Sequence, residues 1–262
     1  MKPHDTENYG VAASSFLLFS ITWNTIPPAF FTTGGPMGVT AKRRKTGGLL
    51  ITLEGPEGSG KSTQIRNLAA ALRRSGYPVV QTREPGGTVV AEAIRRTLLL
   101  SSSREPITPE AESLLILAAR SQHVTHLIAP ALQRGAIVLC DRFSDSTFAY
   151  QGFARGLDLA WLQAANAVAT NGRSPDLTLL FDVPVAVGLA RRRRAQGKQN
   201  RLDRESVRFH RLVRQGFLQL AAQSPRRIKV VDADRSEGEI RAEVTKFVLA
   251  WITTRRSKPG KR

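Results

Sequence analysis

The sequence predicts an α/β fold in which a five-stranded parallel sheet is flanked by helices. Five apolar runs have the length of strands, and longer segments with helical spacing separate them. Strands that alternate with helices favour a parallel sheet that is buried on both faces. A glycine-rich stretch with one lysine also comes directly after the first run. The five predicted strands cover residues 49–54, 78–83, 136–141, 177–182 and 228–233.

The segment after the first strand has the clearest helical pattern. Ile65, Leu68, Ala69 and Leu72 lie at positions i, i+3, i+4 and i+7, so they share one face of a helix. Gly76 is placed to end this helix, because glycine readily adopts the left-handed conformation that follows a last helical turn. A helix is therefore predicted between the first and second strands.

A later helix is predicted to begin at Thr108, whose side chain can cap the first turn. Pro109 suits the first helical position because its fixed φ is already helical. Glu110 and Glu112 follow in the first turn, where the helix dipole favours negative charge.

Composition indicates one domain in a reducing compartment. The 262 residues are 41% hydrophobic, which is enough for one good-sized core. Cys140 is the only cysteine, so no internal disulfide can form, and we expect a cytoplasmic protein. The histidines form no metal-ligand pattern with it. The net charge of +18 suggests anionic partners (nucleotides, nucleic acid or a membrane surface), although arginines can also simply coat a solvated surface.

The first 46 residues differ in composition from the rest. Residues 8–41 carry no charged side chain, which would suit a signal peptide or a membrane anchor with the basic stretch 42–45 as its flank. The start carries more acid than base, unlike a signal peptide. The Pro27–Pro28 pair also interrupts the apolar run before the ~20 residues that a spanning helix needs. We interpret residues 1–46 as a disordered leader or a mis-assigned start, with Met37 as the initiator.

The strongest functional motif follows the first strand. Gly55, Gly60, Lys61 and Ser62 fit the pattern G-x-x-x-x-G-K-[ST] between a strand and a helix, which is the placement that a phosphate-binding loop requires. Glycines let backbone N–H groups turn toward phosphates, and the helix N-terminus adds partial positive charge. Lys61 would reach the β- and γ-phosphates, and the Ser62 hydroxyl would ligate Mg²⁺. The predicted nucleotide-binding residues are Gly55, Pro56, Glu57, Gly58, Ser59, Gly60, Lys61, Ser62 and Thr63.

Three further stretches follow the ends of predicted strands, or the helix after one: "TREPGGT" at 82–88, "DRFSDSTFAYQG" at 141–152, and an arginine-rich segment at 191–206. Ligands bind at the carboxyl ends of parallel strands in open α/β sheets. Asp141 ends a buried strand and is the kind of carboxylate that holds Mg²⁺ through water. Arg142 can neutralise charge on an acceptor phosphate, since a guanidinium matches phosphate geometry. A structural Asp–Arg salt bridge is the alternative.

These motifs resemble the bacterial thymidylate kinase family. "EGPEGSGKST", "TREPGGT", "AAR" at 118–120, "DRFSDSTFAYQG" and "PDLTLLFDV" occur in the family's order and spacing, and the resemblance covers roughly residues 48 to 252. It implies a phosphate-loop nucleoside monophosphate kinase with a mobile lid. It also implies Mg²⁺-dependent transfer of the γ-phosphate of ATP to dTMP, giving dTDP for dTTP synthesis. Because family members usually dimerise through helices, a homodimer is expected as well.

The resemblance also implies how the sugar and phosphate of dTMP are held. Glu57 matches an acid that receives the deoxyribose 3′-hydroxyl, which would explain a carboxylate beside ATP phosphates. Tyr150 matches a tyrosine packed against the sugar where a ribose 2′-hydroxyl would sit. Arg142 matches an arginine that approaches the monophosphate. Without the resemblance, Tyr150 could be an ordinary half-buried tyrosine.

For the thymine base, the resemblance implies a third set of residues. Arg120 lies on the helix whose family counterpart reads the thymine edge, although alone it would be taken for a surface arginine. Thr147 matches a position near the base, and Pro85 matches a cis-proline that shapes the acceptor site. Family members commonly carry a phenylalanine near Ile116 that stacks on thymine, and this chain has none.

The arginine-rich segment at 191–206 resembles the mobile lid, because Gly197 and the polar residues after it break the helical pattern. The variable positions of the phosphate loop hold no basic residue, so the lid is expected to supply an arginine to the transferring phosphoryl group. Arg201 in "NRLD" is the best positional match. The alternative, a solvated helix end, applies to the arginines at 191–194.

Two rival functions stay open. One is a kinase of another nucleoside monophosphate or of a deoxynucleoside, against which the 118–120 and 141–152 motifs argue. The other is an ATP-binding switch or motor on nucleic acid. No aromatic-rich basic surface or nucleic-acid motif supports that rival, and the basic tail at 253–262 is expected to be disordered. We therefore expect ATP and dTMP as partners, and neither nucleic acid nor a membrane.

Overall fold

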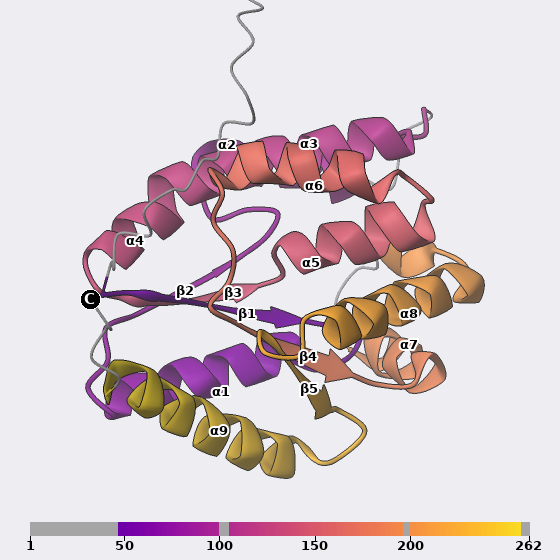
Figure 1. Ribbon diagram of the computed structural model, residues 1–262. Coiled ribbons are helices and arrows are strands. Elements are labelled where there is room, and N and C mark those ends of the chain that lie inside the picture. The colour runs from indigo at the N-terminus through magenta and orange to yellow at the C-terminus, as the bar shows by residue number, and fades with distance from the viewer. Residues whose placement is uncertain (1–46, 100–104, 196–199, 258–262) are drawn as a thin grey trace, which may run out of the picture. The chain divides into compact units, whose positions relative to one another are not determined.

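The computed structural model describes residues 47–99, 105–195 and 200–257. Its centre is a sheet of five parallel strands in the order β2-β3-β1-β4-β5 (Figure 1). This confirms the predicted fold class and places each predicted strand to within one residue at either end. The strands are β1 (Leu49–Glu54), β2 (Val79–Arg83), β3 (Ile137–Asp141), β4 (Leu177–Asp182) and β5 (Ile228–Asp232).

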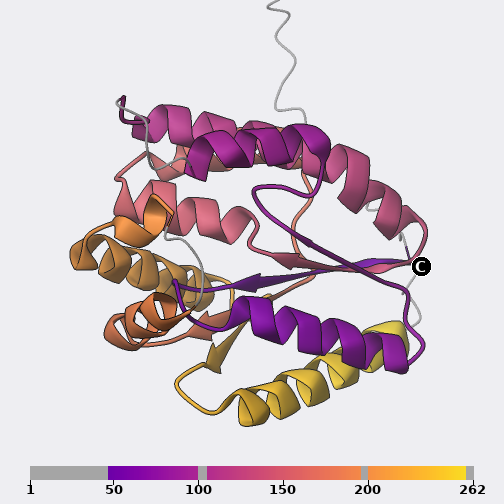
Figure 2. The same ribbon diagram turned by 180° about the vertical axis from the view of Figure 1, so that it is seen from behind.

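Helices cover both faces of the sheet (Figures 1 and 2). The α1 and α9 helices lie against one face, and α2 to α6 lie on the other, where α8 packs against the segment after α5. The helices are α1 (Lys61–Arg74), α2 (Val89–Leu99), α3 (Pro109–His123), α4 (Ala129–Gln133), α5 (Ser144–Thr147), α6 (Leu159–Thr170), α7 (Val185–Arg194), α8 (Val207–Gln223) and α9 (Glu237–Ser257). Shorter helical turns are η2 (Val124–Ile128), η3 (Phe148–Ala154) and η4 (Leu202–Arg204).

The α1 helix follows the predicted pattern. Ile65, Leu68, Ala69 and Leu72 are all buried, and they share one core with the inner strands and with α9. The helix ends at Arg74, two residues before the predicted terminator. Because β1 is completely buried and leads directly into this helix, the loop between them is held at both ends.

The predicted start of α3 is also confirmed. Thr108 has an extended backbone, and its side chain accepts a hydrogen bond from the amide of Ala111 at 3.2 Å. Pro109 occupies the first turn, together with Glu110 and Glu112.

The C-terminal helix runs further than the sequence indicated. The α9 helix continues to Ser257, so part of the segment interpreted as a disordered tail is helical. The hydroxyls of Thr253 and Thr254 donate to helix carbonyl oxygens one turn earlier. Arg255 binds Asp176 at 2.7 Å and lies over the ring of Trp251, which ties the last turn to the domain.

The leader, 1–46, lies outside the described residues, as do 258–262. Among the helices that the structure does describe, none combines the length and the apolar character that crossing a membrane requires.

Candidate active site

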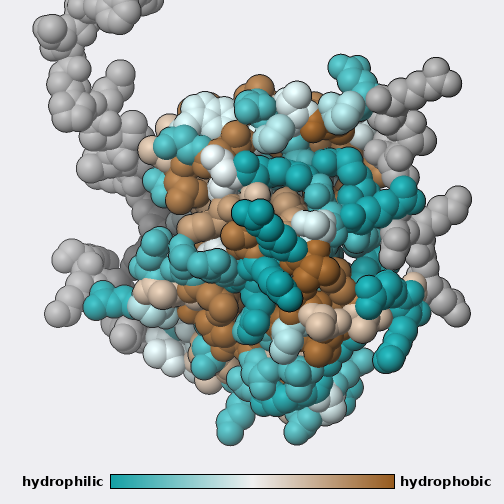
Figure 3. All heavy atoms as spheres, turned by 90° about the vertical axis from the view of Figure 1, so that its right-hand side faces the viewer, coloured by the Kyte–Doolittle hydropathy of each residue, from teal (hydrophilic) through white to brown (hydrophobic). Residues whose placement is uncertain are grey.

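The predicted site residues gather at the carboxyl ends of three neighbouring strands. Glu54 ends β1, Arg83 ends β2 and Asp141 ends β3, and these ends carry the phosphate loop, the "TREPGGT" segment and the "DRFSDSTFAYQG" segment. Parallel strands bring these ends to one edge of the sheet. Figure 3 views this end of the domain, where hydrophilic and hydrophobic residues both reach the surface. Segments far apart in the sequence therefore share one site.

The phosphate loop takes its shape from glycines. Gly55, Gly58 and Gly60 have φ values of +143°, +70° and +86°, which residues with side chains rarely adopt. Close packing restricts Gly58 further, because a β-carbon there would lie 1.9 Å from the carbonyl oxygen of Gly188 in α7. A β-carbon on Gly188 would in turn lie 2.4 Å from the carbonyl oxygen of Glu57. The loop is thus packed, backbone against backbone, on the start of α7.

Lys61 points back into the phosphate loop, where its ammonium group meets only neutral oxygens. Its Nζ donates to the carbonyl oxygens of Gly55 and Pro56, both at 2.9 Å, and to Ser59 Oγ at 3.1 Å. Burial, and after it the charge of Arg142, lower the pKa of Lys61 to about 8. A buried cation with neutral partners is well suited to bind an incoming polyphosphate.

Ser62 and Asp141, the two predicted magnesium ligands, lie together. Ser62 Oγ donates to Oδ2 of Asp141 at 2.9 Å. Ser62 is exposed and Asp141 is half-buried, so a ligand can reach both. Mg²⁺ in phosphoryl-transfer sites takes few protein oxygens and completes its shell with substrate phosphates and water. The pair fits Mg²⁺ in this way, and within the described ranges no larger group of acidic, histidine or cysteine side chains could hold a metal alone.

Glu57, Arg142 and Tyr150 form a hydrogen-bonded cluster beside the phosphate loop. Arg142 Nη2 donates to Oε1 of Glu57 at 2.7 Å, and Tyr150 Oη donates to the same oxygen at 2.9 Å. The Arg142 guanidinium also lies over the Tyr150 ring, 5.0 Å from its centroid. The structure therefore brings together the three residues assigned to the sugar and phosphate.

Electrostatics keep the two charged members of this cluster ionised. Burial disfavours the Glu57 carboxylate, but the charges of Arg142 and Lys61 outweigh it and lower the pKa of Glu57 to about 2. Burial likewise opposes the charge of Arg142, yet Tyr150 and Glu57 raise the pKa of Arg142 above its ordinary value. Burial raises the pKa of Tyr150 well above its usual range, so its hydroxyl remains a donor. At neutral pH the cluster is an ion pair with a neutral phenol.

Arg120 lies in a second, more deeply buried network. Its Nε donates to Oε2 of Glu84 at 2.7 Å, and its Nη1 donates to Thr147 Oγ1 at 2.9 Å and to Asn166 Oδ1 at 2.8 Å. The other oxygen of Glu84 is 3.0 Å from Nδ1 of His123. Arg120 is only 2% exposed, so it is not the surface arginine that the sequence alone would suggest.

The loop between β2 and α2 is held by the same network. The Glu84–Pro85 peptide is cis, as expected from the resemblance. Gly87 has a φ of +83°, and a β-carbon on it would lie 2.7 Å from the His123 ring, so the loop packs closely on α3. Pro85 therefore stands directly beside the carboxylate that holds Arg120.

The structure adds residues that the sequence reasoning missed. Arg95 in α2 donates to the carbonyl oxygen of Pro85 at 2.9 Å, and burial, together with the charges of Arg83 and Arg142, lowers the pKa of Arg95. The only sequence feature that could have indicated Arg95 is its place in the helix that directly follows the "TREPGGT" motif. Asn166 in α6 carried no signal, because nothing in its surrounding sequence suggests a ligand.

The predicted lid begins inside a helix. The α7 helix runs to Arg194, and Arg193 and Arg194 are exposed, as a solvated helix end would be. Arg192 instead binds both oxygens of the buried Asp203, at 3.0 and 2.8 Å. That hydrogen bond raises the pKa of Arg192 against the effect of burial, and the charges of Asp203 and then of Glu57 add to it. The predicted hinge at Gly197 lies outside the described residues.

Arg201, the predicted lid arginine, is directed toward α2 and α3. Its Nε donates to the carbonyl oxygen of Leu98 at 3.2 Å, and its Nη2 binds Oε2 of Glu112. Glu112 is 1% exposed and also accepts a hydrogen bond from Gln151 at 2.7 Å. Arg155 completes this cluster by pairing with Glu112 and Glu205.

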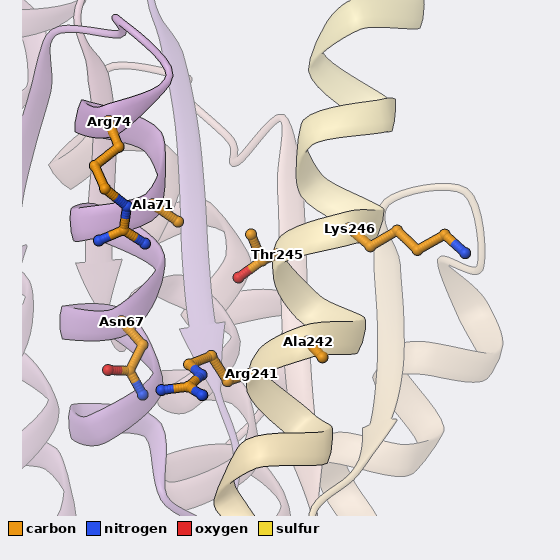
Figure 4. A pocket seen from close by; sticks show the side chains of 7 residues that line it. All are labelled: Asn67, Ala71, Arg74, Arg241, Ala242, Thr245 and Lys246. Atoms are coloured by element: carbon orange, nitrogen blue, oxygen red, sulfur yellow. The ribbon is translucent and has the colours of Figure 1, made fainter.

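A separate groove lies between α1 and α9, with a volume of about 330 Å³ (Figure 4). Short side chains leave it unfilled, notably those of Ala71, Ala242 and Thr245, while Arg74 and Arg241 extend along its sides. None of the residues predicted to bind nucleotide or substrate lines it. The groove is therefore distinct from the site at the strand ends.

Comparisons with known proteins agree with this geometry. The family model described as thymidylate kinase matches residues 53–244. The thymidylate kinase of Thermomicrobium roseum is 55% identical over 183 residues, which cover 70% of this chain and 86% of that protein. That of Ectopseudomonas mendocina is 49% identical over 197 residues, or 75% of this chain and 93% of that protein. The crystal structure of thymidylate kinase from Ehrlichia chaffeensis superposes with a TM-score of 0.61 at 33% identity, covering 77% of this chain and 98% of that one. The chain thus belongs to the thymidylate kinase family, enzymes that phosphorylate dTMP to dTDP with ATP.

Proposed function

We propose that the site has two halves, which act on the two substrates of this reaction. The donor half is the phosphate loop, 55–63, with Asp141, and it binds ATP. The acceptor half consists of Glu57, Arg142, Tyr150, Arg120, Thr147 and Pro85, and it binds dTMP. The observation that carries this proposal is that Arg142 Nη1 donates to the carbonyl oxygen of Gly55, the first loop residue, at 3.1 Å. The two halves therefore meet where a phosphoryl group would pass between substrates.

In the donor half, Lys61 leaves its neutral partners to bind the β- and γ-phosphates. A phosphate oxygen of dTMP then attacks the γ-phosphorus, the bond to the β,γ-bridging oxygen breaks, and ADP leaves. Positioning and charge stabilisation supply most of the catalysis in such transfers. Ser62 and Asp141 would hold Mg²⁺, which offsets negative charge on the phosphates when it is bound.

In the acceptor half, Arg142 binds the monophosphate of dTMP. Its Nη2 is shared with Glu57, so the phosphate and the 3′-hydroxyl of the same nucleotide would meet adjacent groups. Tyr150, which is held by Glu57 and packed edge-on against Phe209 and Phe217, closes the space beside the sugar. This arrangement favours deoxyribose over ribose.

Arg120 and Thr147 lie against each other and would face the thymine base, with Pro85 shaping the adjacent wall. The Glu84 carboxylate and Asn166 fix the orientation of Arg120 before any ligand binds. Ile116 is half-buried and would cover the base by apolar contact in place of an aromatic ring.

The lid would supply a further arginine to the transferring phosphoryl group. Arg201 would have to exchange Glu112 for the phosphates, so its action requires the lid to move. Arg192 is the alternative, because α7 begins against the phosphate loop and Arg192 is one turn beyond Gly188 on the same helix face.

We also propose a homodimer, formed through α2, α3 and α6. These three helices lie next to one another in the upper layer of Figure 1. They carry most of the exposed large apolar side chains among the described residues: Val89, Val90, Leu114, Trp161 and Val168. Exposed apolar side chains that gather on neighbouring elements are typical of an interface.

The remaining proposals concern the ends of the chain and its compartment. The single cysteine, Cys140, is buried and free, which fits a cytoplasmic enzyme. Residues 1–46 are proposed to be a leader that the catalytic domain, 47–252, does not need, and the tail from 253 onward is proposed to have no catalytic role.

Nucleotide product analysis tests the proposal. The protein is incubated with ATP, Mg²⁺ and one monophosphate at a time, and dTDP should form far faster than the diphosphate of any other nucleoside. Rapid ATP hydrolysis stimulated by DNA, without dTMP, would instead favour the nucleic-acid switch. The same assay applied to Arg201→Ala and Arg192→Ala identifies the acting lid arginine. The arginine whose substitution causes the larger fall in kcat is the acting one, because a charge used mainly in the transition state affects kcat more than binding.

A further inference from the structure

Glu54 is a buried carboxyl group that the reaction described above does not use. It is the last residue of β1, directly before the phosphate loop, and it is 0% exposed. Burial, and after it the nearby Asp145 carboxylate, raise the pKa of Glu54 to about 8. No ion pair balances it among the described residues. Burying an acidic group without an ion pair costs free energy, so we expect Glu54 to have a specific role.

Among the described residues, every hydrogen bond of its carboxyl group goes to the turn that carries Arg142. Oε1 of Glu54 accepts from the backbone amide of Phe143 at 2.8 Å and, more weakly, from that of Ser146 at 3.4 Å. Oε2 accepts from Ser146 Oγ at 2.6 Å. The turn needs such support, because Arg142 has a φ of +70°, a value that a residue with a side chain adopts at a cost.

Ser146 connects Glu54 to the guanidinium itself. The hydroxyl that donates to Glu54 also accepts a hydrogen bond from Arg142 Nη1 at 3.1 Å. The other guanidinium nitrogen, Nη2, binds Glu57. The guanidinium plane is therefore fixed from two sides, by Glu57 through Nη2 and by Glu54 through Ser146 and Nη1.

We propose that Glu54 and Ser146 are positioning residues that orient Arg142 toward the acceptor phosphate. This inference depends on the proposed binding of that phosphate by Arg142. Because Glu54 precedes Gly55 in the chain, the same side chain also sets the position of the acceptor arginine relative to the donor loop.

The test measures KM for dTMP, KM for ATP and kcat in Ser146→Ala and Glu54→Gln. Ser146→Ala removes the connection to Arg142 while leaving the carboxylate. Measured above pH 8, where Glu54 is ionised, Glu54→Gln keeps an oxygen for the backbone amides but presents N–H groups to the serine, whose hydroxyl then loses its acceptor. Both should raise KM for dTMP roughly tenfold, a loss of about 1.4 kcal/mol. KM for ATP should change less than about twofold. Ser113→Ala, which removes a buried hydroxyl bonded only to its own helix, is the matched control and should change neither.

The same substitutions are then made in an Arg142→Ala background, with melting temperatures to verify folding. If the two residues act through Arg142, they should have almost no further effect on KM for dTMP there. Equal effects with and without Arg142 would overturn the proposal, as would an unchanged KM for dTMP in Ser146→Ala. If Arg142→Ala itself leaves KM for dTMP unchanged, the assigned role of Arg142 is wrong, and the inference falls with it.

Discussion

The donor and acceptor halves of the site hold their cations in opposite ways. Lys61 is surrounded by two carbonyl oxygens and a hydroxyl, whereas Arg120 and Arg142 are already paired with the carboxylates of Glu84 and Glu57. A lysine among neutral oxygens keeps its charge available for phosphate, and it contributes little to the fold. Paired arginines are fixed in orientation before substrate binds, so they support both the fold and recognition. Substitutions should therefore separate catalysis from stability in the donor half, but not in the acceptor half.

The largest expected effect is in the donor half. Lys61→Ala should lower kcat by about 10³-fold or more, because a charge on the γ-phosphate contributes several kcal/mol to the transition state. The free energy of unfolding should fall little, because Lys61 hydrogen-bonds only to neutral oxygens and the cost of burying its charge outweighs its attraction to Glu57. Steady-state kinetics and urea unfolding measure both quantities, and Lys229→Ala, an exposed lysine in β5, serves as control. Near-normal turnover by a folded Lys61→Ala protein would contradict the phosphate-loop mechanism.

Arg120→Ala, in contrast to Lys61→Ala, should lower the free energy of unfolding strongly. Removing this arginine leaves the Glu84 carboxylate buried without its strongest partner, and breaking a buried ion pair in this way costs about 3–5 kcal/mol of stability. Urea unfolding at neutral pH measures the loss, with Arg134→Ala, an exposed arginine, as control. A variant that unfolds at the same urea concentration as the wild type would show that the pair does not stabilise the domain.

The acceptor half should also weaken in acid. The folded-state pKa of Glu57, about 2, lies below its ordinary value of 4.5, so its ion pair stabilises the fold above pH 4.5. That contribution, of the order of 3 kcal/mol, is lost as the pH falls from 4.5 toward 2. The difference in unfolding free energy between the wild type and Glu57→Gln should therefore shrink steadily as the pH falls from 4.5 toward 2. If the unfolding free energies of the two proteins changed in parallel with pH, the ion pair of Glu57 would not stabilise the fold.

Sugar selectivity tests the acceptor half more finely. The Tyr150 ring should exclude a ribose 2′-hydroxyl at a cost of roughly 1–3 kcal/mol, which favours dTMP over its ribo counterpart by roughly ten- to a hundredfold in kcat/KM. Tyr150→Ala should shrink this ratio, and Tyr150→Phe should preserve it because the ring remains. Glu57→Gln should slow both substrates alike, since both carry the 3′-hydroxyl. An unchanged ratio in Tyr150→Ala would place selectivity elsewhere.

The smallest expected effect belongs to the leader. A protein that starts at Met37 should keep the kcat and both KM values of the full chain, because every residue assigned to either half of the site lies after residue 47. Loss of activity or of folding on truncation would show that the leader packs on the catalytic domain.

The backbone of both halves could be predicted from sequence, whereas much of their side-chain pairing could not. The phosphate loop and the strands follow from local patterns: glycine spacing, apolar runs and a capping threonine. The partners of Arg120 and Arg142 do not, because Glu84 and Asn166 meet Arg120, and Ser146 connects Glu54 to Arg142, only after distant segments fold together. The continuation of α9 to Ser257 was missed for the same reason, since Asp176, which binds Arg255 in its last turn, is far away in the chain. Local chemistry thus indicates where a site lies, and tertiary contacts decide how its charges are balanced.

The contact between Gly58 and Gly188 limits how the proposed lid could move. The two backbones touch where any larger residue would collide, so the start of α7 cannot slide or tilt against the phosphate loop without separating the pair. A closing movement must therefore pivot beyond Gly188. In the proposed lid, the arginines at 191–194 would then move with the part of the segment beyond this pivot, while the phosphate loop and the start of α7 stay in place.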